Sequence, residues 1–258
     1  MRLQDKVAFI TSAQHPCARA IALGFASEGA RCVVGDEVAD RAETLAAELR
    51  SLGRQSLSLS FNLTLKLSVE EAVRRAVTEF GRIDVLLNCS GITQQADFLG
   101  FTEEAFNQCV ERGPKAYFLT CQAIGRQMAA QRSGKIINLS TTAARIASGE
   151  SVGNSVAYSS IDAMTRAIAQ ALGFYGVNVN SLVCGPLDEN ALSREEAGAR
   201  IRRIPIGRLA KAEDLVGAAV FLATGDSNFV SVIGETRVIP EDLQASYEKI
   251  SGYFAERE

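Results

Sequence analysis

The 258-residue chain has one histidine, no tryptophan and six cysteines without a CxxC pair. So little histidine argues against a His-based triad or a histidine-rich metal site, and we expect no bound metal. The cysteine spacing predicts small apolar side chains in a reducing cytoplasm rather than disulfides or metal ligands. No basic run marks a nucleic-acid partner, and no apolar stretch approaches the ~20 residues that cross a membrane.

Short apolar runs alternate with amphipathic helical patterns along most of the chain. The runs predict strands at residues 7–11, 31–35, 56–62, 85–89, 135–140, 177–183 and 235–239. Helices are predicted at 18–28, 39–52, 103–128, 158–173 and 211–223, and one more begins at a capping box of Ser68 and Glu71 and ends at Gly81. This alternation predicts a single-domain Rossmann-type α/β fold, with a doubly wound parallel sheet of about seven strands and helices on both faces. The domain spans residues 1–239, and residues 240–258 form a C-terminal tail.

Three segments carry a family resemblance: FGRIDVLL at 80–87, GKIINLS at 134–140 and IPIGRL at 204–209. Together with shorter matches between residues 5 and 240, they resemble the short-chain dehydrogenase/reductase (SDR) family. The resemblance implies an NAD(P)-dependent oxidoreductase scaffold. Because one fold hosts many functions, the activity depends on the residues at the site.

The positions that bind the cofactor in this family are changed here. The family's first βα turn reads T-G-x-x-x-G-x-G, and this chain has TSAQHPCA at 11–18. Pro16 has no N–H to offer a phosphate, and Ser12 places a Cβ where the family needs glycine's conformational freedom. The resemblance implies six degenerate cofactor positions: Ser12, Pro16, Ala18, Asp36 at the ribose, Asn62 near adenine, and Glu189 where a threonine contacts the nicotinamide amide.

The catalytic positions are changed as well. Tyr158 keeps the place of the family's catalytic tyrosine, but Asp162 replaces the lysine one helical turn later. A carboxylate there disfavours the phenolate and leaves a neutral phenol, which cannot serve as the acid/base. Thr141 takes the place of the serine, and Gly113, followed by Pro114, takes that of the asparagine. The Gly-Pro pair predicts a bend or break in the helix, and Asp162 is expected to pair with Arg166 on the helix surface.

These losses predict a pseudoenzyme: a non-catalytic subunit of a hetero-oligomeric SDR-type alcohol dehydrogenase, in which a homologous active subunit binds NAD. The pattern of losses resembles the inactive subunits of heteromeric dehydrogenases in this family, the clearest of which acts in a β-oxidation-type step of anaerobic toluene degradation. A cofactor-independent enzyme similar to halohydrin dehalogenases and a divergent active reductase remain as alternatives. Helical apolar faces containing Ile161, Met164 and Ile168, and apolar residues at 247, 250 and 254 of the tail, predict contacts with the partner.

Overall fold

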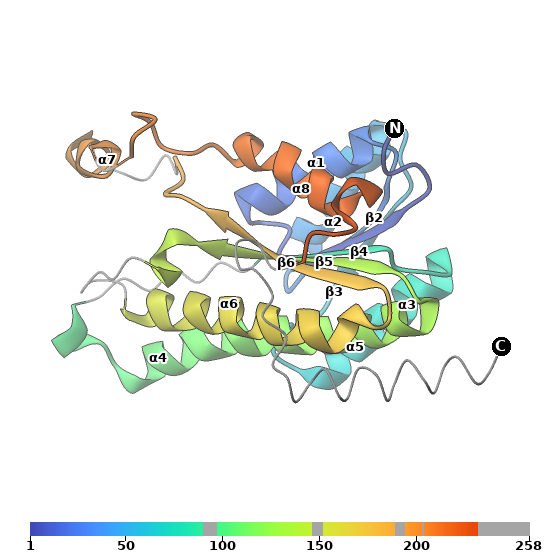
Figure 1. The fold of residues 1–258 in the computed structure, drawn as a ribbon, viewed down its shortest axis with the longest axis horizontal. Coiled ribbons are helices and arrows are strands. Elements are labelled where there is room, and N and C mark those ends of the chain that lie inside the picture. The colour runs from blue at the N-terminus through green and yellow to red at the C-terminus, as the bar shows by residue number, and fades with distance from the viewer. Residues whose placement is uncertain (90–96, 146–151, 189–193, 203, 232–258) are drawn as a thin grey trace.

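The structure, a computed structural model, describes residues 1–89, 97–145, 152–188, 194–202 and 204–231. In these ranges six parallel strands form one sheet in the order β3-β2-β1-β4-β5-β6 (Figure 1). The strands are β1 (Val7–Ile10), β2 (Arg31–Asp36), β3 (Ser56–Ser60), β4 (Val85–Asn88), β5 (Gly134–Thr141) and β6 (Val177–Cys184). The predicted Rossmann-type parallel sheet is confirmed. The predicted strand at 235–239 and the tail at 240–258 lie outside the described residues.

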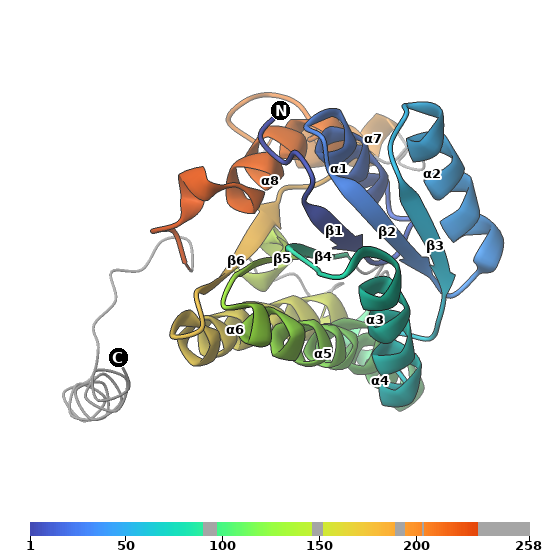
Figure 2. The same ribbon diagram turned by 90° about the vertical axis from the view of Figure 1, so that its right-hand side faces the viewer.

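Helices cover both faces of the sheet (Figures 1 and 2). One layer holds α1 (Pro16–Ser27), α2 (Ala39–Ser51) and α8 (Val216–Ala223), and the other holds α3 (Lys66–Phe80), α5 (Ala116–Gln131) and α6 (Val152–Gly173). The shorter elements are η1 (Phe98–Gly100), α4 (Glu103–Val110), the π-helical η2 (Glu111–Lys115), η3 (Thr142–Ala144), α7 (Arg194–Ile201), η4 (Ala212–Leu215) and η5 (Gly225–Ser227).

Both faces of the central strands are apolar because both are covered. In β1, Ala8 and Ile10 pack into the core under α1 and α2, while Val7 and Phe9 pack into the core over α3 and α5. Successive side chains of a strand point to opposite faces, so this continuous apolar run serves two cores at once. The same pattern in the sequence is what predicted a doubly covered sheet.

Four helix starts differ from the predictions: α1 begins at Pro16 rather than at residue 18, α8 begins at Val216 rather than at residue 211, and α3 and α6 differ as follows. α3 begins at Lys66, and the Ser68 hydroxyl accepts the N–H of Asn62 at 2.9 Å instead of capping the helix, so the predicted capping box is wrong. α6 begins at Val152 rather than at residue 158. The end of α3 at Gly81 is confirmed, because that residue has the left-handed φ of 78° that favours glycine.

The long helix predicted over 103–128 is interrupted. It divides into α4, the π-helical η2 and α5, and Gly113 inside η2 has φ −94° and ψ −106°, outside the helical region. Pro114 cannot donate to the helical ladder, so the preceding turn widens. The predicted break at the Gly-Pro pair is confirmed.

A buried polar network fixes α5 and α6 against the sheet. Asn88 of β4 accepts from Thr120 of α5 at 2.8 Å and donates to Asn138 of β5 at 3.0 Å. Asn138 in turn donates to Thr165 of α6 at 2.9 Å. All four residues are at most 1% exposed, so each bond replaces lost contact with water. Asn88 therefore links β4 to both α5 and β5.

Within the described ranges, no helix has both the length and the apolar character of a membrane-spanning segment.

Candidate functional site

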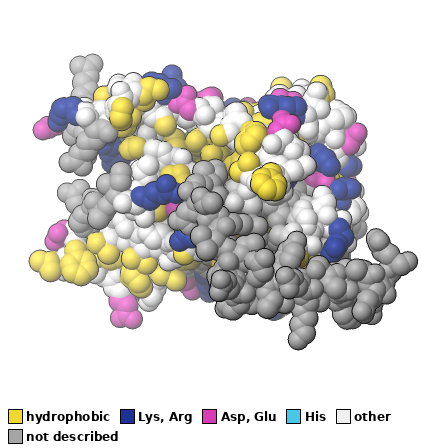
Figure 3. All heavy atoms as spheres, in the orientation of Figure 1, with side chains coloured by type: hydrophobic (Ala, Val, Ile, Leu, Met, Phe, Trp, Pro, Cys, Tyr) yellow, Lys and Arg dark blue, Asp and Glu magenta, His cyan; other side chains and the backbone are white. Residues whose placement is uncertain are grey.

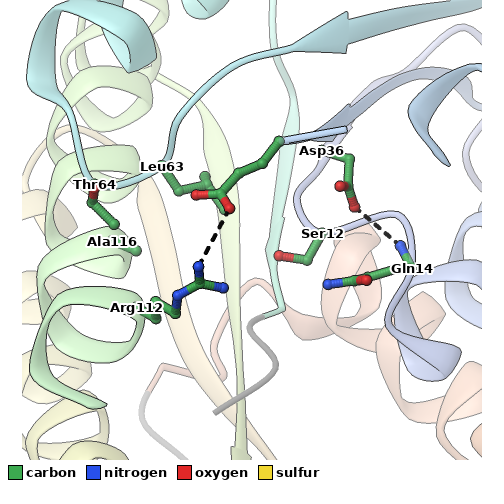
Figure 4. A pocket seen from close by; sticks show the side chains of 8 residues that line it. Ser12, Gln14, Asp36, Leu63, Thr64, Arg112 and Ala116 are labelled. Atoms are coloured by element: carbon green, nitrogen blue, oxygen red, sulfur yellow. Dashed lines mark hydrogen bonds and ion pairs between the residues drawn. The ribbon is translucent and has the colours of Figure 1, made fainter. Parts of the chain in front are cut away.

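A small hollow lies between the β1–α1 turn and the end of β2 on one side and the residues around η2 on the other (Figure 4). Its volume is about 40 Å³, which is room for a few water molecules. The lining residues come from four parts of the chain: Ser12, Gln14, Asp36, Glu37, Leu63, Thr64, Arg112 and Ala116. The fold therefore brings Ser12 and Asp36, two of the cofactor positions predicted from the sequence, into one site.

The turn before α1 keeps a left-handed backbone without a glycine. Ser12 has φ 56°, the region that glycine enters without steric cost. The turn closes when the N–H of His15 donates to the Ser12 carbonyl at 2.9 Å. The left-handed backbone expected at this position is therefore present, but Ser12 adopts it at a steric cost that glycine would not have.

The first turn of α1 offers few donors to an anion. Pro16 occupies the first helical position and has no N–H, and the N–H of Cys17 donates to the His15 imidazole Nδ1 at 3.2 Å. Ala18, another of the degenerate cofactor positions, is fully buried in the core.

Asp36 is 3% exposed, so it is not the solvated loop carboxylate that its acidic neighbours suggest. Its carboxylate accepts the N–H of Gln14 at 3.2 Å and that of Val38 at 3.0 Å, and the Arg41 guanidinium lies 3.9 Å away. The side chain therefore ties the β1–α1 turn to the end of β2.

Asn62, another of the predicted cofactor positions, is not among the described residues that line the hollow. Asn62 folds into a local turn in which its Oδ1 accepts from the backbone and hydroxyl of Thr64, at 2.7 and 2.8 Å. Across the hollow, Arg112 lies 3.8 Å from Glu37, an ion pair between η2 and the end of β2 (Figure 4). Glu189 lies outside the described residues.

At the positions of the family's catalytic residues, the described side chains make contacts within the fold. Tyr158 is 6% exposed and packs with Tyr117, Ala157 and Ile161. The Thr141 hydroxyl accepts the N–H of Ala143 at 3.2 Å and so caps η3. At Gly113 no side chain is present to complete a catalytic tetrad.

Asp162 is not at the helix surface. Its side chain is 8% exposed and accepts a hydrogen bond from the Ser181 hydroxyl of β6 at 2.9 Å, whereas Arg166 is exposed. The predicted Asp162–Arg166 ion pair is therefore absent from the described interactions. The carboxylate points toward the sheet because residues 158, 161, 162, 165 and 169 share the inner face of α6.

Three interactions were missed from the sequence: the His15 cap, the Glu37–Arg112 pair and the Asp162–Ser181 bond. The first had a usable signal, since a residue directly before a proline at a helix start occupies the N-cap position. The other two join residues far apart in the sequence. The periodicity of apolar residues along the sequence does not indicate which polar side chains of distant segments will come into contact.

Three of the buried cysteines have thiols whose pKa lies well above the ordinary value. Burial raises the pKa of the Cys32 and Cys121 thiols to about 12 and raises that of Cys89 even further. Their sulfurs are therefore protonated and act as small apolar groups, as the sequence predicts. Among the described residues, no group of three or more His, Cys, Asp or Glu is placed to hold a metal ion.

Comparisons with known proteins place this scaffold in a family. Residues 6–199 match the short chain dehydrogenase family. Galactitol 2-dehydrogenase of Agrobacterium fabrum is 31% identical over 245 residues, covering 89% of this chain and 94% of the relative. The BbsD subunit of a (hydroxy(phenyl)methyl)succinyl-CoA dehydrogenase of Thauera aromatica is 29% identical over 234 residues, covering 90% and 94%. A gluconate 5-dehydrogenase of Burkholderia cenocepacia, solved with NADP and tartrate, superposes with a TM-score of 0.86 at 26% identity, covering 90% of this chain and 94% of that one. The chain belongs to the short-chain dehydrogenase/reductase family.

Proposed function

We propose that this chain is a non-catalytic subunit of a hetero-oligomeric SDR-type alcohol dehydrogenase and that it binds no NAD itself. The observation that carries the proposal is the first turn of α1. A dinucleotide's diphosphate needs free N–H groups and space at this turn. Here Pro16 has no N–H and that of Cys17 is already bonded to His15. These residues do not fit the diphosphate.

The catalytic positions support the same function. An acid/base tyrosine needs a cation nearby to favour its phenolate, and Asp162 supplies a carboxylate one turn away. The bond from Ser181 holds that carboxylate against β6, where it contributes to packing between α6 and the sheet. A cofactor-independent enzyme of the halohydrin-dehalogenase kind also needs a cation at this position, so the same residue argues against it.

In this proposal, NAD and the chemistry belong to a homologous active subunit. The BbsD relative is named as a subunit of a dehydrogenase that acts on an acyl-CoA. This supports a place for the chain in a hydroxyacyl-CoA oxidation of the β-oxidation type, such as that of anaerobic toluene degradation. A heterotetramer is the assembly we propose.

The partner face is proposed on α5 and α6, which lie side by side beneath the sheet (Figure 2). Ile161, expected at this face, is instead fully buried in the core, and Met164 and Ile168 are only partly buried. Three alanines, Ala163, Ala167 and Ala171, are exposed on α6, with the exposed Arg166 and Gln170 beside them. Residues four apart share a helix face, and small side chains let a partner helix approach closely.

A second apolar surface lies on η1 and α4. Phe98 and Leu99 of η1 are 62% and 91% exposed, and Phe106 of α4 is 39% exposed. Figure 3 shows hydrophobic side chains gathered over this end of the molecule, at the lower left. Exposed apolar groups that lie together favour a protein contact.

Calorimetry tests the cofactor part of the proposal. NAD⁺ and NADP⁺, each titrated at millimolar concentration into the purified chain, should give no saturable heat. A dissociation constant below about 100 μM, which corresponds to about 5.5 kcal/mol, contradicts the proposal. An active SDR enzyme titrated in the same buffer is the positive control.

A charged residue in place of an exposed alanine of α6 tests the partner face. Ala167→Arg should weaken assembly with the active subunit, because a large cation then stands where the helices meet. Ala47→Arg is the matched control, since Ala47 is exposed on α2 in the opposite helix layer. Size-exclusion chromatography of the co-expressed subunits measures the effect. Equal assembly of both variants would exclude this face.

A further inference from the structure

The N-terminus of α1 is capped by a side chain of this chain, His15. His15 has an extended backbone, with φ −70° and ψ 127°, and its imidazole Nδ1 accepts the N–H of Cys17 at 3.2 Å. Its carbonyl accepts the N–H of Arg19 at 3.1 Å, the first hydrogen bond of the helical ladder. Because Pro16 has no N–H, the first two helical positions present only one donor, the N–H of Cys17. The His15 side chain accepts that N–H.

The cap depends on an imidazole that carries no charge. Burial lowers the pKa of His15 to about 4, so the ring is neutral near pH 7 and its Nδ1 lone pair is available. A neutral ring also adds no positive charge to the helix end. It therefore satisfies the backbone without attracting an anion.

The turn that presents His15 is held in place from two sides. The His15 N–H donates to the Ser12 carbonyl at 2.9 Å. The N–H of Gln14 donates to the Asp36 carboxylate at 3.2 Å, and that carboxylate also accepts from Val38. Asp36, which is 3% exposed, therefore serves to position the cap.

We propose that His15 and Pro16 together act as an intramolecular substitute for a bound phosphate. His15 satisfies the helix end that a phosphate would otherwise satisfy, and Pro16 removes the neighbouring donor. The fold then stands without a nucleotide, and anions are excluded from the site. This inference rests on the proposed function, in which the chain works without its own cofactor.

Melting temperatures test the cap. His15→Ala should lower the midpoint by about 2–4 °C, the shift expected for loss of one N-cap in a domain of this size. His15→Asn should restore most of that loss, because asparagine is a strong N-cap residue. Gln14→Ala is the neighbouring control and should leave the midpoint unchanged, since its backbone N–H, not its exposed side chain, bonds Asp36. A midpoint of His15→Ala equal to that of the unmodified chain overturns the cap.

ADP and inorganic phosphate test the exclusion. The double variant His15→Gly with Pro16→Gly frees two backbone N–H groups at the helix end. By calorimetry it should bind ADP at least tenfold more tightly than the unmodified chain, with adenosine as the control lacking phosphate. No gain for ADP or phosphate in a folded double variant overturns the exclusion. Binding of NAD by the unmodified chain contradicts the proposed function instead, so the two failures are distinguishable.

Discussion

Replacement of Asp162 by lysine restores the residue type that the SDR family has at this position, and we expect the variant to lose stability without gaining activity. In the structure the carboxylate is 8% exposed and bonded to Ser181 at 2.9 Å. Lysine removes that acceptor and brings a cation into the same buried place. The described partner at this position is the Ser181 hydroxyl, which carries no negative charge.

The magnitude follows from the lost hydrogen bond. Removing a charged acceptor from a buried donor costs about 1–3 kcal/mol, and burying an ammonium without a partner adds to this. We expect a loss on the order of 3 kcal/mol. With an m-value of about 3 kcal/mol/M, the urea midpoint falls by about 1 M. Asp162→Asn keeps an oxygen for Ser181 and should cost less than about 1 kcal/mol.

Two assays follow the same variant. Urea denaturation, monitored by circular dichroism, measures the stability. Oxidation of NADH in the presence of ketone substrates measures hydride transfer, which should be absent if, as proposed, the chain neither binds nor orients the nicotinamide. A midpoint equal to that of the unmodified chain refutes the structural role of Asp162. Measurable hydride transfer refutes the loss of the cofactor site.

Three more predictions follow from the first turn of α1 and the tail. The pKa of His15 is lowered to about 4 in the folded chain, below the 6.5 of a free histidine. The stability that the neutral His15 cap contributes to the folded chain is therefore fully present above pH 6.5 and declines as the pH falls toward 4. This loss of stability is on the order of 1–2 kcal/mol after allowance for partial solvent contact. The His15→Asn variant should lack it when stability is measured as a function of pH. The same pH dependence in the variant and the unmodified chain would contradict the role of His15. Ser12→Gly should raise stability by about 0.5–1 kcal/mol, because glycine accepts the left-handed φ of 56° without strain, and a lower melting temperature would disprove this. Deletion of residues 240–258 should weaken assembly or the partner's activity in co-expression, and full activity of the truncated complex counts against a role for the tail.

The sequence predicted most of the scaffold because its signals are local and periodic. The apolar run at β1 and the glycine at the end of α3 each depend on neighbours within a few residues, and both predictions are confirmed. The break at Gly113 was predictable for the same reason, since proline acts on its own turn. The prediction of a capping box at Ser68 was wrong because the Ser68 hydroxyl accepts a hydrogen bond from a different donor, the N–H of Asn62.

The site was harder to predict, because its bonds join distant segments. Asp162 has a neighbour of opposite charge one turn away, which favoured a surface ion pair. The inner face of α6 instead turns the carboxylate toward Ser181, nineteen positions along the chain. Ile161 was placed at the partner face by the same local reasoning, and it is buried for the same geometric reason. Which face of a helix packs inward depends on the sheet beneath it.

Native mass spectrometry of the chain purified from its own host tests the central claim most directly. We predict a hetero-oligomer that contains a second SDR chain, with NAD bound in stoichiometry to that second chain alone. A monomer or a stable homo-oligomer without an SDR partner, or NAD retained on this chain, would contradict it.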